Sequence, residues 1–268
     1  MNRICLTAQL FLCAAAVLFS VSSKVIVVPS DGIKSIAAAM SIARQGDTVK
    51  VMEGRYRESV FINSGVTLLS NTPFGAVIDG RGKGTNVTMG TGSTISGFEI
   101  RNGTVGILSS STQATIKQCR ITGNLQSGIM AVGTLPNIED NFIVYNKGSG
   151  IQGWDVRTTS GSVNHNTIAF NGNHGISLGG TSAVTVENNI IAFNEQFGVK
   201  PGDETVRIEL INNNFYQNTK FTSTLPTDNI SADPLFADAK RHNYNLQKES
   251  PCIGLGRDNQ NLGARILH

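Results

Sequence analysis

"HNTIAFN" (165–171) returns almost unchanged 23 residues later as "NNIIAFN" (188–194). Related segments flank this pair, namely "GFEIRN" (97–102), "QCRITGN" (118–124), "DNFIVYN" (140–146) and "NNNFYQN" (212–218). Aligned beneath one another, the six segments share one apolar position, occupied by Ile100, Ile121, Ile143, Ile168, Ile191 and Phe215. The chain therefore contains an internal repeat with spacings of 21 to 25 residues.

A second landmark accompanies the repeat, a glycine followed by an aliphatic residue. It occurs at Gly106, Gly128, Gly150, Gly175 and Gly198. A period of this length, rich in β-branched residues, glycine and asparagine, indicates a stacked solenoid of either leucine-rich repeats or β-helical coils. The L-x-x-L-x-L pattern is missing, and apolar residues alternate too briefly to leave room for a helix in each repeat. We therefore predict an all-β chain in which each repeat is one coil of a parallel β-helix.

An asparagine column lies two residues before the repeated apolar position. Its members are Asn141, Asn166, Asn189 and Asn213, and the two earlier coils carry Phe98 and Cys119 there. Strands of successive coils pair about 4.8 Å apart. Identical asparagines one coil apart can then hydrogen-bond to each other and to the turn backbone. We interpret the column as a structural ladder and not as a set of active-site amides.

The first 23 residues have the character of a secretory signal peptide. Arg3 supplies a positive charge, residues 6–19 are mostly apolar, and residues 20–23 include small residues suited to cleavage. The apolar run is shorter than the roughly 20 residues of a membrane span, while Cys13 leaves a lipid anchor open. We expect an exported protein without an integral membrane segment, either secreted, periplasmic or at the cell surface.

Residues 24–268 are predicted to form a single domain. Its N-terminal cap, about 24–47, contains a helix that begins after Ser30 or Asp31 and ends at Gly46. The apolar residues of this helix follow helical spacing, at Ile33, Ile36, Ala37, Met40 and Ala43. The helix is expected to cover the open end of the solenoid. Coils occupy about 48–218, a loop and a C-terminal cap about 219–268, and the protein is expected to be a monomer.

Charge and cysteine content restrict the partners and the covalent structure. Without the signal peptide the chain has 21 basic and 19 acidic residues, a formal balance of +2. It has no basic stripe that would neutralise phosphates, so nucleic acid is not expected as a partner. Cys119 and Cys252 then remain. A disulfide between them and two separately buried thiols are both open, and we favour the thiols.

Segments near both ends resemble those of a known family. "GDTVKVMEGRYRESVFI" (46–62) is similar to the opening of exported right-handed parallel β-helix proteins of the pectin-lyase-like superfamily. "DPLF" (233–236), "SPCIGLG" (250–256) and "LGARI" (262–266) resemble the closing segment of one bacterial group within it. The resemblance implies a right-handed coil, in agreement with the general bias of parallel crossovers. Because these motifs lie in caps and turns, they say little about a reaction.

Outward side chains of neighbouring coils form the candidate site. The residue after each glycine-aliphatic landmark should face solvent. This outward row consists of Met130, Gln152, Ser177 and Lys200. Near the row, Trp154, the single tryptophan of the chain, lies in a glycine-flanked loop. We predict that Trp154 and Gln152 bind the substrate, with the indole ring either stacked on a sugar or folded over the solenoid wall.

Three carboxylates near the outward row are the predicted metal ligands, Asp155, Asp203 and Glu204. Asp155 and Asp203 lie two coils apart, roughly 10 Å at the strand spacing of a sheet. Carboxylates of this kind suit Ca²⁺, a hard cation that requires several oxygen ligands. The competing interpretation is that all three are solvated turn residues.

Lys200, Arg157 and His174 are the predicted catalytic residues. Lys200 or Arg157 could act as a base or clamp a substrate carboxylate. Their competing interpretation is a surface charge. His174, within "NGNHGI" (171–176), has a structural hydrogen bond as its competing interpretation. The same structural interpretation applies more strongly to His165 in "VNHNTI" (163–168).

Three functions follow from these features. The resemblance implies a lyase or epimerase, of the pectate-lyase type, that abstracts a proton beside a uronate carboxylate of an acidic polysaccharide. The Asp-Pro-His-Asp stretch expected in β-helix epimerases is missing, so turnover stays open. The alternative is a non-catalytic protein that binds glycan or builds a cell-surface structure. A periplasmic metal-handling accessory protein is the third, although four His and five Met without paired spacing argue against a copper site.

Overall fold

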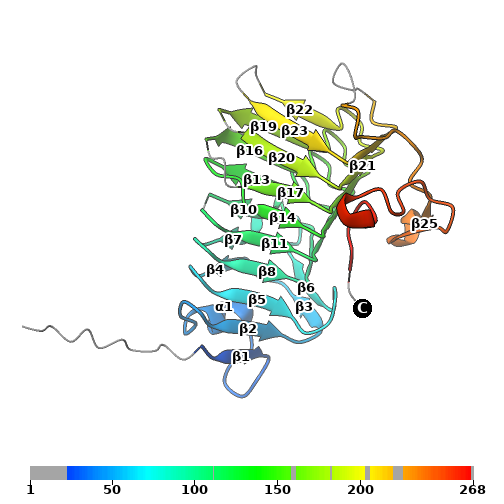
Figure 1. Cartoon of the computed structure of the whole chain (residues 1–268). Coiled ribbons are helices and arrows are strands. Elements are labelled where there is room, and N and C mark those ends of the chain that lie inside the picture. The colour runs from blue at the N-terminus through cyan, green and yellow to red at the C-terminus, as the bar shows by residue number, and fades with distance from the viewer. Residues whose placement is uncertain are drawn as a thin grey trace, which may run out of the picture.

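The computed structural model describes residues 23–110, 112–157, 161–181, 183–202, 206–219 and 226–266. Over these residues the chain winds into a parallel β-helix, with the first strand at one end of the solenoid (Figure 1). The predicted right-handed parallel β-helix is confirmed. The predicted signal peptide, apart from Ser23, lies outside the described residues and stays a prediction.

Three long parallel sheets run along the described part of the solenoid, and most coils contribute one short strand to each. The nine-stranded sheet contains β1 (Val25–Val28), β2 (Thr48–Val51), β5 (Thr67–Ser70), β8 (Thr94–Ser96), β11 (Thr115–Lys117), β14 (Asn137–Glu139), β17 (Ser162–Asn164), β20 (Ala183–Glu187) and β23 (Arg207–Ile211). The eight-stranded sheet contains β3 (Gly54–Tyr56), β6 (Ala76–Asp79), β9 (Glu99–Arg101), β12 (Arg120–Thr122), β15 (Phe142–Val144), β18 (Thr167–Ala169), β21 (Ile190–Ala192) and β24 (Asn214–Tyr216). The seven-stranded sheet contains β4 (Val60–Ile62), β7 (Thr85–Met89), β10 (Val105–Ser109), β13 (Ile129–Val132), β16 (Ile151–Val156), β19 (Ile176–Gly180) and β22 (Val199–Pro201).

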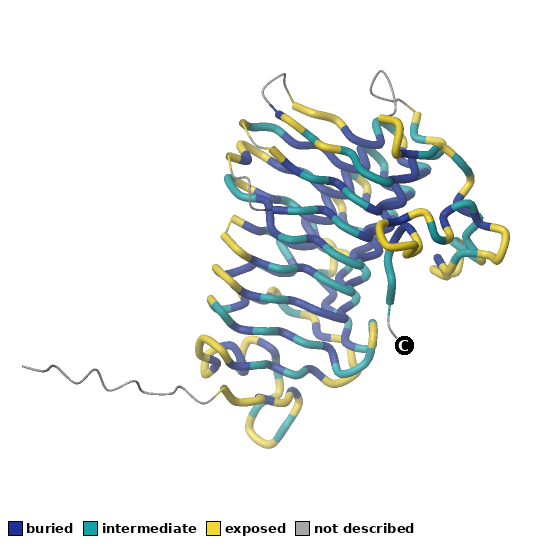
Figure 2. The backbone as a smooth tube through the Cα atoms, viewed as in Figure 1, coloured by how far each residue is buried: buried dark blue, intermediate teal, exposed yellow. Residues whose placement is uncertain are grey.

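The repeated apolar position forms a continuous column in the eight-stranded sheet. Its members pair in register from coil to coil, Ile100 with Ile121, then Ile143, Ile168, Ile191 and Phe215. All six side chains are buried, and Figure 2 shows the buried interior along the solenoid. Each side chain up to Ile191 therefore packs between the equivalent side chains of the two neighbouring coils, and Phe215 ends the column on the last strand of the sheet.

The predicted asparagine ladder is confirmed. The side chain of Asn166 accepts the backbone N–H of Asn141 at 3.0 Å and its Nδ2 at 2.9 Å, and the same pattern links the next coils. Asn229, from the segment after the last coil, accepts from Asn213 in the same way. A second ladder runs through Asn124, Asn146, Asn171, Asn194 and Asn218. Both ladders are internal, and they satisfy polar backbone groups at the turns.

The glycine of the second landmark is required by close packing. A Cβ atom added to Gly150 would lie 2.7 Å from Cγ2 of Ile168 and 2.8 Å from the carbonyl oxygen of Gly175. Similar approaches occur at Gly106, Gly128, Gly175 and Gly198. These glycines leave the space into which the second asparagine ladder fits, so the landmark recurs in the coils that carry this ladder.

Substitution of Gly150 by alanine is expected to lower the free energy of unfolding by about 2 kcal/mol, because overpacking forces the coil to shift. Gly179→Ala is the matched control, since the nearest atom to its added Cβ is 3.8 Å away. Urea denaturation followed by circular dichroism measures both variants. Equal stability of the two variants would show that the coil absorbs the methyl group without strain.

The N-terminal cap contains a strand and a shorter helix than expected. β1 pairs in parallel with β2, and α1 spans only Ile36–Met40. The prediction that Ser30 or Asp31 caps this helix is wrong, because Ser30 pairs with Ile33 in a bridge and the chain turns there first. Ser35 is the N-cap and accepts the backbone N–H of Ala38 at 3.1 Å.

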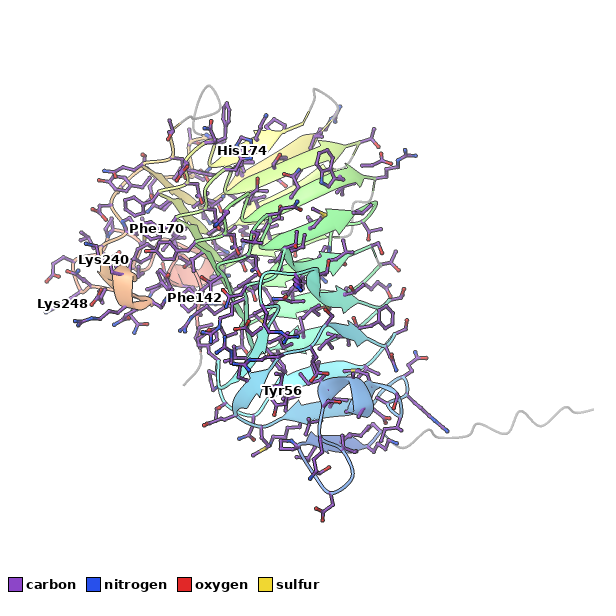
Figure 3. All side chains as sticks on the ribbon, turned by 180° about the vertical axis from the view of Figure 1, so that it is seen from behind. Tyr56, Phe142, Phe170, His174, Lys240 and Lys248 are labelled. Carbon is purple, nitrogen blue, oxygen red and sulfur yellow. The ribbon has the colours of Figure 1, made fainter. Side chains whose placement is uncertain are left out.

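The C-terminal segment (226–266) packs on the flank of the solenoid. It contains β25 (Phe236–Asp238), the short helix η1 (Ala239–Arg241), β26 (Asn243–Leu246) and the short helix η2 (Arg257–Asn259). Tyr244, Cys252 and Leu262 are buried against outward apolar residues of the eight-stranded sheet, such as Phe142 and Ile190. Figure 3 shows Phe142 and Phe170 beside this segment, with Lys240 and Lys248 on its outer side. These apolar side chains need cover, which is why the predicted cap lies along the sheet.

The two cysteines of the described chain are separate buried thiols, as favoured from the sequence. Cys119 precedes the asparagine ladder and donates its backbone N–H to Asn141. Cys252 lies beneath the C-terminal segment, where its sulfur accepts from Asn214 at 3.1 Å. Burial raises the pKa of both thiols, to about 12 for Cys119 and about 11 for Cys252.

None of the helices in the described ranges is long and apolar enough to cross a membrane.

Candidate functional site

The predicted row pairs in register on the seven-stranded sheet, but its exposure varies, since Met130 and Gln152 are half-buried, Ser177 is buried and Lys200 is exposed. Met130 pairs with Gln152, Gln152 with Ser177, and Ser177 with Lys200, each on the next strand. Neighbouring side chains of the row are therefore about 4.8 Å apart along the solenoid axis. Lys200 is exposed, and its side chain forms no hydrogen bond or ion pair with another residue in the described ranges.

The row forms one wall of a cavity of about 290 Å³, which we call the Trp154 cavity. Its side chains come from β16, β19, β22 and the turn before β19, namely Gln152, Trp154, Asn173, His174, Ser177 and Lys200. Glycines 153, 179 and 202 line the rest. Four residues with predicted roles, Gln152, Trp154, His174 and Lys200, thus meet at one place. Asn173 was not predicted, although it precedes His174 in the same turn.

Trp154 and Asp155 both face solvent, Trp154 by the regular alternation of β16 and Asp155 because of a β-bulge. Gly153 pairs with Leu178 and Val156 with Gly180, so Trp154 and Asp155 together face the single residue Gly179 of the neighbouring strand. Asp155 has the left-handed backbone that such a bulge needs, with φ of 49°. Trp154 is 57% exposed and pairs in register with Val132, which is also exposed. The ring is accessible for stacking on a sugar, and its role in binding the substrate stays a prediction.

His174 is buried, and one of its ring nitrogens has a structural partner. Nδ1 accepts the backbone N–H of Phe197 at 3.2 Å, and the two rings lie 5.6 Å apart. This hydrogen bond places the proton of the neutral imidazole on Nε2. His174 therefore holds the Phe197 turn in position, and its catalytic role stays a prediction.

Asp155 and Arg157 pair with each other outside the Trp154 cavity. Arg157 donates from Nε to Oδ1 of Asp155 at 2.8 Å. The side chain of Arg157 is 70% exposed and that of Asp155 is 62% exposed. This hydrogen bond raises the pKa of Arg157 above its ordinary value. Arg157 thus remains a cation at neutral pH and is suited to clamping a carboxylate, not to acting as a base.

The predicted calcium site rests on residues of which only one can be placed. Asp203 and Glu204 lie outside the described residues, and Asp155 is engaged by Arg157. Ca²⁺ takes six to eight oxygen ligands, so the single placed carboxylate does not make up such a site. Among the residues with described positions, no group of three or more His, Cys, Asp or Glu is arranged to hold a metal ion.

The fold and this cavity define a parallel β-helix protein with an open cavity on one sheet. The protein-family comparison matches residues 42–233 to the family described as "Periplasmic copper-binding protein (NosD)". This match covers well over half of the chain, and the chain belongs to the NosD family. No curated protein sequence matches the chain.

Solved structures of pectin-degrading enzymes share the architecture. A pectate lyase, Pel9A, aligns over 93% of this chain and 98% of its own, with 13% identity and a TM-score of 0.63. A deglycosylated pectin methylesterase from Aspergillus niger aligns over 81% of this chain and 94% of its own, with 14% identity and a TM-score of 0.50. At such identities the similarity establishes the fold alone.

Proposed function

We propose that this chain is an exported, periplasmic protein that recognises an acidic polysaccharide at the Trp154 cavity. The observation that carries the proposal is the meeting, in one open cavity, of an exposed indole ring and an ammonium group with no described partner. Support for export comes from the predicted signal peptide and from the description of the family as periplasmic. Shared architecture with a pectate lyase supports a polysaccharide ligand.

Each group of the cavity has a defined task toward such a ligand. The indole ring of Trp154 offers a flat apolar face for a sugar ring. Lys200 pairs with the carboxylate of a uronate residue. Gln152 and Ser177 supply an amide and a hydroxyl that can donate to and accept from sugar hydroxyls. Because the row runs along the solenoid axis, successive sugars of one polymer can lie on successive coils.

Turnover is proposed as β-elimination. This step requires the amine form of Lys200 in place of the ammonium that binds the uronate. The amine takes the proton from the carbon next to the uronate carboxylate, the electron pair forms a C=C bond, and the glycosidic C–O bond breaks to release the neighbouring sugar, whose oxygen takes a proton from water. Arg157 would neutralise the carboxylate only after its side chain leaves Asp155 and turns toward the cavity. His174 carries its proton on Nε2 and can donate a hydrogen bond to the substrate there, whereas a role as the base would require the other tautomer. A calcium requirement is proposed only as a dependence to be measured, and no step is derived through the ion.

The test combines binding and turnover on a panel of acidic polysaccharides, with calcium or with a chelator. Fluorescence reports binding, because Trp154 is the single tryptophan of the chain. Ultraviolet absorbance reports the double bond that elimination leaves. Absorbance lost in Lys200→Ala would support the lyase, whereas binding without absorbance leaves recognition or epimerisation, which exchange of protons with solvent separates. A panel without binding or absorbance overturns the proposal in favour of a structural role.

Replacement of Trp154 by alanine is expected to weaken polysaccharide binding about 30-fold, as at other aromatic hot spots. Calorimetry measures this affinity, since the variant lacks the fluorescent ring. Leu255→Ala is the control, because Leu255 is 47% exposed and belongs to the C-terminal segment on another flank. Comparable affinities of the two variants would place the sugar elsewhere.

Copper binding is a second candidate function, favoured by the description of the NosD family. Titration of the metal-free chain with Cu(I) and Cu(II), followed by mass spectrometry, tests it. Uptake of copper in a fixed ratio, retained in Trp154→Ala, would favour metal handling over polysaccharide recognition.

A further inference from the structure

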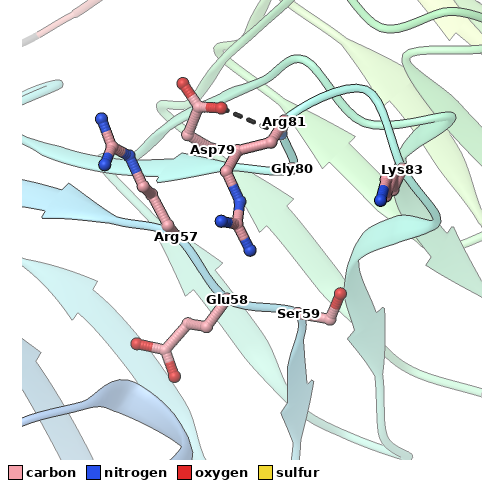
Figure 4. A pocket seen from close by; sticks show the side chains of 7 residues that line it. All are labelled: Arg57, Glu58, Ser59, Asp79, Gly80, Arg81 and Lys83. Carbon is pink, nitrogen blue, oxygen red and sulfur yellow. Dashed lines mark hydrogen bonds between the residues drawn. The ribbon is translucent and has the colours of Figure 1, made fainter.

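A second cavity lies in the N-terminal half of the solenoid (Figure 4). This basic cavity has a volume of about 390 Å³ and lies between residues 57–59, which connect β3 to β4, and residues 79–83 at the end of β6. Its side chains are Arg57, Glu58, Ser59, Asp79, Arg81 and Lys83. Three of these six are cations, so the state of the two carboxylates decides the charge that a ligand would meet.

The negative charge of Asp79 is compensated by side chains that do not line the cavity. Asp79 is 1% exposed and accepts from Arg55 at 2.6 Å, from Arg101 at 3.2 Å and from Asn102 at 3.1 Å. The backbone N–H of Arg81 donates to its other oxygen at 3.0 Å. Burial alone would raise the pKa of Asp79, but these hydrogen bonds outweigh it and lower the pKa to about 2. Its charge is therefore permanent and already compensated.

Glu58 caps the N-terminus of helix α1. Its two carboxylate oxygens accept the backbone N–H groups of Ile36 at 3.0 Å and Ala37 at 2.9 Å, the first residues of α1. The positive end of a helix favours such a carboxylate. In Figure 4 the carboxylate of Glu58 points away from Arg81. Glu58 therefore does not compensate the cations of the cavity.

Arg57, Arg81 and Lys83 are exposed cations whose side chains form no hydrogen bond or ion pair with other residues of described position. Two of them come from the turn "GRGKG" (80–84). Arg81, Gly82 and Gly84 have φ of 53°, 78° and 59°, a left-handed backbone that favours glycine. This tight turn presents Arg81 and Lys83 toward the same cavity, where Ser59 adds a hydroxyl donor.

The basic cavity and the Trp154 cavity lie along the same edge of the solenoid. Both are lined by connections that precede strands of the seven-stranded sheet, before β4 and β7 in one case and before β19 in the other. Between β7 and β16 lie β10 and β13. At the spacing of paired strands the two cavities are thus at least about 14 Å apart, a distance that an extended polymer spans.

We propose that the basic cavity is an oxyanion site that binds a carboxylate of the acidic polysaccharide whose other sugars occupy the Trp154 cavity. The identity of this ligand rests on the proposed function, while the oxyanion site itself rests on Arg57, Arg81 and Lys83. Guanidinium and ammonium groups recognise carboxylates by charge-assisted hydrogen bonds.

The experiment compares wild type, the double variant Arg81→Ala/Lys83→Ala and the control Lys240→Ala/Lys248→Ala, which removes two exposed cations on the other flank. Fluorescence of Trp154 follows the binding of polygalacturonate and of its trisaccharide at low and high salt. We expect the double variant to bind the polymer about tenfold more weakly at low salt, with a smaller salt dependence. The trisaccharide, too short to span both cavities, should bind equally to all three proteins.

Two results separate the inference from the proposed function. Unchanged polymer affinity and salt dependence in Arg81→Ala/Lys83→Ala would overturn the basic cavity as a subsite and leave the Trp154 cavity intact. If wild type binds no polymer, the proposed function fails. Thermal stabilisation by inorganic sulfate then tests whether the basic cavity binds an oxyanion at all. Stabilisation of wild type but not of the double variant would retain an oxyanion site with another ligand, and equal stabilisation would overturn it.

Discussion

Asn166→Ala is expected to lower the free energy of unfolding by about 4 kcal/mol. Asn166 is fully buried, and its Oδ1 accepts the backbone N–H and Nδ2 of Asn141. Its Nδ2 donates to the carbonyl oxygen of Ile138 at 2.8 Å and to Oδ1 of Asn189 at 3.1 Å. Alanine leaves these groups buried without partners, and each such group costs about 1–3 kcal/mol.

Urea denaturation of Asn166→Ala measures this loss, with Asn245→Ala as the control. Asn245 is exposed on the C-terminal segment, and its replacement should change the stability by less than about 0.5 kcal/mol. Solenoids can lose cooperativity when one coil is weakened. Fluorescence of Trp154, one coil before Asn166, and circular dichroism should therefore be recorded together. A loss below about 1 kcal/mol with coincident transitions would show that the asparagine ladder contributes little to the free energy of unfolding.

The coils could be predicted from the sequence because successive coils need the same residue types at equivalent positions for packing and hydrogen bonding. The column through Ile143 and Ile168 needs an apolar residue in every coil, and the column through Asn141 and Asn166 needs the same amide in successive coils. Gly150 is needed because backbone and side-chain atoms would lie within 3 Å of any added Cβ atom. These constraints recur at a fixed period, and the period makes them visible.

The caps could not be placed in the same way, because their contacts are made only once. Ser35 is the helix N-cap since the chain first turns at Ser30, and nothing in the local sequence distinguishes the two serines. Arg265 reaches Asp140 at 2.8 Å, 125 residues earlier in the chain. Asn229 joins the ladder only 16 residues after Asn213, outside the repeat. Such long-range contacts leave no periodic signal.

In the candidate sites, too, features that follow the repeat could be predicted and contacts that occur only once could not. The outward row placed Gln152 and Lys200 together because alternation along a strand is regular. The ion pair of Asp155 with Arg157 depends on a bulge, which alternation does not predict. The basic cavity has no periodic signal either, since its turn "GRGKG" (80–84) has the composition of a simple connection between coils. Its function depends on the compensation of Asp79 by residues of other coils.

His165 makes the stability of the protein sensitive to acid. The ring is 4% exposed, and within the described ranges neither of its nitrogens has a hydrogen-bond partner. Burial lowers the pKa of His165 from 6.5 to about 4; nearby Arg265 lowers it further and Asp140 opposes the shift. Between these two values the unfolded chain binds a proton that the native ring excludes. Stability is therefore complete above about pH 6.5 and falls as the pH drops toward 4, by roughly 3 kcal/mol in all.

His165→Asn is expected to flatten this dependence, because asparagine tolerates the left-handed backbone of His165 and does not titrate. Urea denaturation at several pH values between 4 and 7 measures the slope in both proteins. A smaller slope should remain, since burial also lowers the pKa of His242. Asp79 contributes only in stronger acid, because its pKa is about 2 and its stabilisation is lost below the ordinary carboxyl range. An unchanged slope in His165→Asn would assign the acid sensitivity to another group, because removal of the buried imidazole removes the proton that drives it.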